Sequence, residues 1–153
     1  MPQSLYIRDF REYRFMNSYS IDDISVGLKE SFKVTVTDSM MQAFRDITGD
    51  INPLHTDENF AKGKNYPDKV VYGMLTSSFL STLAGVYLPG EKSLIREVEV
   101  KLKKPVFVGD ELTVSGEVTE VNKDFKIFSM KVAITNQAGE KVLRGIMQMG
   151  VLD

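Results

Sequence analysis

Cysteine and tryptophan are missing from this sequence of 153 residues, and histidine occurs only once. Without cysteine the chain forms no disulfides, binds no metal through thiolates and has no cysteine nucleophile. Charge of one sign is not in excess either, because 19 Lys and Arg residues stand against 21 Asp and Glu residues. Nucleic acid selects clustered positive charge, so we expect no nucleic-acid partner.

Long apolar runs are also missing. The longest apolar stretch, residues 74–88, is broken by Ser and Thr side chains and is shorter than the roughly 20 residues that cross a bilayer. Residues 1–10 contain no basic segment followed by an apolar core, which is the pattern of a secretory signal. We therefore expect a cytoplasmic protein with no membrane partner.

The composition is typical of one globular domain. Hydrophobic residues make up 42% of the chain and charged residues 26%, and a chain of this length buries roughly two thirds of its unfolded surface. Residues 1–25 mix aromatic and charged side chains without a sustained period, which predicts an N-terminal arm whose structure the pattern does not define. Residues 26–153 are predicted to form the domain.

The first half of this domain shows the patterns of a strand, a short helix and a loop. Residues 30–36 alternate between polar and apolar side chains, the period of a half-buried strand. Asp38 and Ser39 offer N-cap oxygens to a short amphipathic helix that ends at Gly49. Residues 50–72 contain Asn-Pro, Gly and Pro-Asp, so we predict a loop with one helical turn in it.

The second half predicts one long helix and four strands. Residues 73–87 are small or apolar almost all the way round, and such a helix requires protein on most of its sides. Alternating apolar residues then predict strands near residues 97–103, 112–118, 128–134 and 141–151. The order of elements predicts an α+β domain in which a curved, largely antiparallel sheet wraps one central helix, although other α+β folds share this pattern.

One short segment concentrates the residues that carry acid–base chemistry. Asp50 and His55, the only histidine, are separated by an Asn-Pro turn that can fold both side chains toward one pocket. Histidine gains and loses its proton near neutral pH, and a carboxylate beside it can orient a water molecule or accept its proton. The alternative interpretation is an ordinary turn next to a structural histidine.

Residues 44–116 resemble the MaoC-like dehydratases, a family that includes the R-specific enoyl-CoA hydratases. Four motifs carry the resemblance, in the family's order and spacing: Gly49-Asp50-Ile51-Asn52-Pro53-Leu54-His55, Tyr72-Gly73-Met74-Leu75, Leu88-Pro89-Gly90 and Lys104-Pro105-Val106-Phe107-Val108-Gly109-Asp110. The resemblance implies a hot-dog fold. It also implies a homodimer or a dimer of dimers, because these families build their active sites at a two-fold interface.

The resemblance also assigns roles to residues. It implies that Asp50 and His55 form the catalytic dyad and that the N–H of Gly73 binds the thioester oxygen. Substrate contacts are expected from four further residues: Asn52, Tyr72, Met74 and Ser81. Close packing is the alternative interpretation for Gly73 and Ser81, and Tyr72 stands where family members usually have histidine, a difference that bears on substrate choice.

The implied activity is that of a hydro-lyase, which reversibly adds water to a trans-2-enoyl thioester and gives the R-3-hydroxyacyl product. We expect no metal and no cofactor apart from coenzyme A or acyl carrier protein as the carrier of the substrate. Two alternatives remain open, a hot-dog acyl-thioesterase and a non-catalytic module that binds acyl thioesters. The Asp-x-Asn-Pro-x-His arrangement argues against the thioesterase. The presence of both Asp50 and His55 argues against the module, because a site that only binds has no need of the pair.

Overall fold

The computed structural model describes residues 16–153, so residues 1–15 of the predicted N-terminal arm lie outside the described residues. In the described part of the arm, a 3-10 helix spans Ile21–Asp23. Ile21 and Ile24 are buried in the same apolar core as the sheet and the central helix. The domain boundary that we placed before residue 26 stays a prediction.

Five strands form one curved sheet in the order β1-β3-β4-β5-β2, and every neighbouring pair is antiparallel. The strands are β1 (Lys29–Thr35), β2 (Ser93–Leu102), β3 (Glu111–Asn122), β4 (Ile127–Thr135) and β5 (Lys141–Val151). The predicted antiparallel α+β architecture is confirmed. Strand β2 begins at Ser93, before the predicted residue 97. The alternating pattern does not extend back to this start, because a bulge between Ile95 and Glu97 interrupts it.

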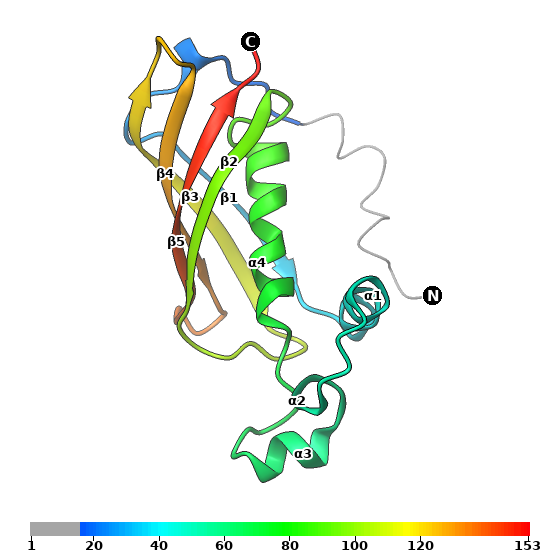
Figure 1. Cartoon of the computed structure of the whole chain (residues 1–153). Coiled ribbons are helices and arrows are strands. Elements are labelled where there is room, and N and C mark those ends of the chain that lie inside the picture. Colours follow the sequence, from blue (N-terminus) through cyan, green and yellow to red (C-terminus); the bar gives the residue numbers. More distant parts are fainter. Residues whose placement is uncertain (1–15) are drawn as a thin grey trace.

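The central helix α4 (Gly73–Thr82) continues into a π-helical turn at Leu83–Tyr87 and lies across one face of the sheet (Figure 1). Its buried side chains, among them Phe79 and Leu83, pack into the core. The opposite side of α4 is open in the single chain, where Met74 is 67% exposed. Among residues 16–153, no helix has both the length and the apolar character needed to cross a membrane.

Three short helices lie beyond one end of the sheet, beside the start of α4 (Figure 1): α1 (Asp38–Thr48), α2 (Pro53–Thr56) and α3 (Glu58–Gly63). As predicted, α1 ends at Gly49, which is left-handed with φ 72°. The predicted N-caps were wrong. The cap is Thr37, which is still extended and whose hydroxyl accepts from the Met40 N–H at 3.3 Å, whereas Asp38 and Ser39 are already helical.

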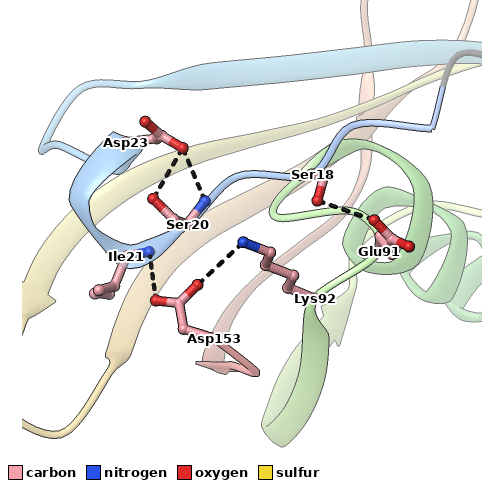
Figure 2. A network of polar contacts seen from close by, with 7 residues as sticks. All are labelled: Ser18, Ser20, Ile21, Asp23, Glu91, Lys92 and Asp153. Carbon is pink, nitrogen blue, oxygen red and sulfur yellow. Dashed lines mark hydrogen bonds and ion pairs between the residues drawn. The ribbon is translucent and has the colours of Figure 1, made fainter.

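The described N-terminal segment is fixed at the other end of the sheet by the polar contacts in Figure 2. Asp153 accepts a hydrogen bond from the Ile21 N–H at 3.1 Å and pairs with Lys92 at 3.4 Å. The N–H and hydroxyl of Ser20 both donate to Asp23 at 2.9 Å. The Ile21 N–H stabilises the charged carboxylate of Asp153, and so the pKa of Asp153 lies below its ordinary value.

Tyr19 and Asn17 tie the same segment to β1, and Asn17 also ties it to the end of the π-helical turn. The Tyr19 hydroxyl donates to the Glu30 carboxylate at 2.7 Å. The Asn17 amide donates to Glu30 at 3.1 Å and to the carbonyl of Tyr87 at 2.9 Å. The hydrogen bond to Glu30 raises the pKa of Tyr19 to about 12. These contacts are remote from α1, α2 and α3.

Candidate active site

His55 lies in the four-residue helix α2, which the Asn-Pro turn starts. Pro53 occupies the first turn, where its missing N–H costs nothing, and the Asn52 side chain accepts from the Leu54 N–H at 2.9 Å. The ring atom Nδ1 of His55 is 2.6 Å from the carbonyl oxygen of Val70. Because a carbonyl oxygen only accepts, Nδ1 carries the proton, and Nε2 of the neutral ring is free to accept one.

Asp50 follows the left-handed Gly49 and is half-buried. One carboxylate oxygen, Oδ1, accepts the Asn52 N–H at 3.0 Å, and the Asp50 N–H donates to the Thr48 hydroxyl at 3.3 Å. No residue among 16–153 is hydrogen-bonded to the other oxygen, Oδ2. The turn therefore orients the carboxylate through one oxygen and leaves the second available to a water molecule.

Tyr72 contacts both halves of the predicted dyad. Its hydroxyl donates to the backbone carbonyl of Asp50 at 2.6 Å. Its ring centre lies 4.2 Å from that of His55 and 4.8 Å from that of Phe44. The side chain is buried, with 2% of its surface exposed, and this burial raises the pKa of Tyr72 above its ordinary value. The backbone of Asp50 and the ring of His55 therefore both contact Tyr72.

Gly73 is the first residue of α4 and directly follows Tyr72. No side chain caps this helix, and the first N–H groups of a helix have no partner within it. A Cβ atom at Gly73 would lie 2.5 Å from Cδ1 of Leu102. Leu102 is 54% exposed, so its side-chain tip has room to move. Packing alone is therefore a weak reason for glycine at this position.

The other residues predicted to contact substrate lie on α4 and at the start of α2. The Asn52 side chain caps α2, as described above. Met74 and Ser81 are exposed on the side of α4 that faces away from the sheet, and Ser81 lies two turns from Gly73. Their contact with substrate stays a prediction. In the described part of the chain, no group of three or more His, Asp or Glu side chains is arranged to hold a metal ion.

Sequence reasoning missed two parts of the site, the carbonyl of Val70 and the side chain of Phe44. A carbonyl is present at every residue, so its use by His55 leaves no trace in the sequence. Phe44 lies in α1, and its ring packs on Tyr72.

The comparisons identify the family. The model of the MaoC like domain matches residues 23–141. This chain belongs to the MaoC-like family. An (R)-specific enoyl-CoA hydratase of Aeromonas caviae is 35% identical over 82% of this chain and 94% of that protein. A 3-hydroxybutyryl-CoA dehydratase of Methylorubrum extorquens is 30% identical over 80% of this chain and 76% of its own length.

Solved structures of MaoC-like proteins show the same fold. The (R)-hydratase from A. caviae involved in PHA biosynthesis superimposes with a TM-score of 0.80 at 34% identity, over 84% of this chain and 97% of that chain. The R-hydratase PhaJ1 from Pseudomonas aeruginosa gives a TM-score of 0.83 at 26% identity, over 88% of this chain and 86% of that chain. The predicted hot-dog fold is confirmed for this member of the family.

Proposed function

We propose that this protein is a hydro-lyase that reversibly adds water to the double bond of an enoyl thioester, with Asp50 and His55 as its catalytic dyad. One observation carries the proposal. The hydrogen bond from Nδ1 of His55 to the Val70 carbonyl leaves Nε2 unprotonated in the neutral ring, while Tyr72 holds Asp50 and His55 at one place. Relatives named as enoyl-CoA hydratases and a 3-hydroxybutyryl-CoA dehydratase support the same chemistry.

In the proposed mechanism, the dyad holds one water molecule between Oδ2 of Asp50 and Nε2 of His55. Loss of a proton to the dyad activates this water, whose oxygen forms a bond to C3 of the enoyl chain. The π electrons move to C2 and the thioester oxygen, where the N–H of Gly73 stabilises the negative charge. The proton returns to C2, giving the 3-hydroxyacyl thioester, and the reverse sequence is dehydration.

The carrier of the acyl group is proposed to be coenzyme A. The relatives that are at least 30% identical are named for coenzyme A thioesters, whereas proteins named for acyl carrier protein match a smaller share of this chain. Because the dyad itself activates the water, we propose that neither a metal nor a redox cofactor takes part. The R configuration of the product and a cytoplasmic location stay predictions.

A homodimer is proposed because strand β2 forms an open edge of the sheet. Four apolar side chains of β2 are between 39% and 54% exposed: Leu94, Ile95, Val98 and Leu102. An open edge strand of ten residues that exposes these apolar side chains invites pairing with another strand. A second copy that pairs antiparallel with β2 would extend the sheet and cover the open side of α4 around Met74. Assembly into a dimer of dimers stays a prediction.

The test is the loss of conjugated enoyl absorbance when the purified protein meets short and medium trans-2-enoyl-CoA. We expect turnover by the wild type and a fall of roughly 10²–10⁴-fold in Asp50→Asn and in His55→Ala. Asp57→Asn is the matched control, since Asp57 caps α3 through the Phe60 N–H at 3.1 Å and asparagine caps equally well.

The same samples separate the alternative functions. Release of free thiol would identify a thioesterase, because hydration leaves the thioester intact. Saturable binding of enoyl-CoA without conversion of either bond would identify a non-catalytic module. Full activity in Asp50→Asn would refute the dyad while leaving the fold assignment in place.

A further inference from the structure

The loop that carries Asp50 has few contacts with the rest of the protein. Gly49, Ile51 and Asn52 are exposed, and Ile51 exposes 74% of its surface although it is apolar. The hydrogen bonds made by the amide and the carboxylate of Asp50 reach only residues two positions away. The bond from Tyr72 to the Asp50 carbonyl is the longer-range contact, because it spans 22 positions of sequence.

We propose that Tyr72 is a positioning residue that assembles the dyad, its hydroxyl fixing the main chain at Asp50 and its ring fixing the imidazole of His55. This inference rests on the proposed function and deepens it. The hydroxyl is already donated to Asp50 and the side chain is buried, so Tyr72 acts through the dyad and not by contact with substrate. It therefore takes a role other than the substrate contact expected from the sequence.

The hydroxyl controls where the carboxylate of Asp50 lies. At 2.6 Å the bond is at the short end of O–H···O hydrogen bonds, and it holds the carbonyl of the residue whose side chain must reach the water. Rotation of the main chain there would change the direction of the carboxylate, which the proposed dyad requires to be fixed. Burial raises the pKa of Tyr72, so the phenol stays a protonated donor throughout the physiological range.

The ring controls the plane of His55. The ring centres of Tyr72 and His55 are 4.2 Å apart and the planes are inclined by 30°, while Nδ1 of the same imidazole is held by the Val70 carbonyl. Val70, Val71 and Tyr72 are all buried, and the Val71 N–H donates to the carbonyl of Val106 at 2.8 Å. A rigid segment thus fixes the imidazole at two points, which prepares Nε2 for proton transfer.

Two substitutions separate the hydroxyl from the ring. Tyr72→Phe keeps the ring and removes the bond to Asp50, while Tyr72→Leu removes both. Tyr19→Phe is the matched control, because it also removes one short tyrosine hydrogen bond, to Glu30 of β1 at 2.7 Å, away from the dyad. We expect Tyr72→Phe to lower kcat roughly 10- to 100-fold with KM within about twofold. Tyr19→Phe should leave kcat unchanged.

Two further measurements do not depend on turnover. His55 is the only histidine, so in untagged protein its ring protons give isolated NMR signals. These signals should stay close to the wild-type position in Tyr72→Phe and move in Tyr72→Leu, which lacks the neighbouring ring. Amide hydrogen exchange at Ile51 and Asn52 should accelerate in Tyr72→Phe and not in Tyr19→Phe.

Unchanged kcat or unchanged loop exchange in Tyr72→Phe would overturn the role of the hydroxyl, and an unmoved His55 signal in Tyr72→Leu would overturn the role of the ring. A wild type without hydratase activity would refute the proposed function, and the NMR and exchange results would still decide whether Tyr72 organises the two residues. A loss of kcat accompanied by faster exchange throughout the core would show general unfolding and refute a positioning role.

Discussion

Replacement of Gly73 by proline removes one backbone N–H and is compatible with the fold. Gly73 is the first residue of α4, the helical position at which proline is favoured because its N–H is unpaired in any case. The preceding residue, Tyr72, has φ −53° and ψ 123°, so it lies outside the α region that proline disfavours in its neighbour. The substitution therefore deletes the proposed donor to the thioester oxygen while keeping the helix.

The expected loss of activity follows from the worth of a single oxyanion donor. Removal of one such donor lowers kcat by about 10²–10³-fold, or roughly 3–4 kcal/mol of transition-state stabilisation. Gly73→Ala is the control, because its Cβ meets the same Leu102 tip at 2.5 Å and it retains the N–H. We expect Gly73→Ala to keep much more activity than Gly73→Pro, with similar thermal unfolding midpoints for the two variants.

The assay is steady-state hydration of enoyl-CoA together with thermal unfolding of each variant. If Gly73→Pro turned over as fast as Gly73→Ala while both stayed folded, the N–H would have no part in catalysis. If instead both variants lost stability to the same large extent, close packing against Leu102 would explain the glycine. The first result would remove Gly73 from the proposed mechanism, and the second would assign the glycine to packing.

Three other predictions concern stability and assembly. The Thr76 hydroxyl is buried without a hydrogen bond, so Thr76→Val should raise the free energy of unfolding, measured in urea, by about 1–3 kcal/mol. Thr37→Val removes the N-cap of α1 and should lower the free energy of unfolding by about 0.5–2 kcal/mol. Val98→Lys should convert the dimer into a monomer in light scattering, because it places charge on the open edge of β2. The pKa of Asp153 is lowered, so its stabilising contribution is present above roughly pH 4 and is lost as pH falls. The protection factor of the Ile21 amide should fall in acid, and in Asp153→Ala, which has no side-chain acceptor, it should be low already at neutral pH.

The strands could be predicted from sequence because one face of each strand meets the core. Alternation places Phe32 and Val34 of β1 inside the molecule, and both are buried. Alternation failed to predict the start of β2, where a bulge shifts the phase after Ile95. The N-cap of α1 was also predicted wrongly. There Thr37 and the two residues after it all have suitable side chains, and only the backbone conformation decides between them.

The site was predictable only where its chemistry depends on the type of side chain. Asp50 and His55 stand out because few residues activate water. The acceptor that fixes the tautomer of His55 is a backbone carbonyl, that of Val70, and a carbonyl has no signature in sequence. The contact between Tyr72 and Asp50 joins positions far apart in the chain, so it depends on the folded arrangement of α1, α2 and α4.

The stretch from Val70 to Gly73 connects these separate contacts. Four consecutive residues supply the acceptor for His55, the hydroxyl and ring that meet the dyad, and the proposed N–H donor for the thioester oxygen. The Val70 N–H donates to the backbone carbonyl of Leu54 at 3.1 Å, which ties this stretch to α2. A shift of its backbone would therefore displace the base, the carboxylate and the oxyanion donor together. Val70, Val71 and Tyr72 are buried, and precise placement of all three groups requires a segment anchored in the core in this way.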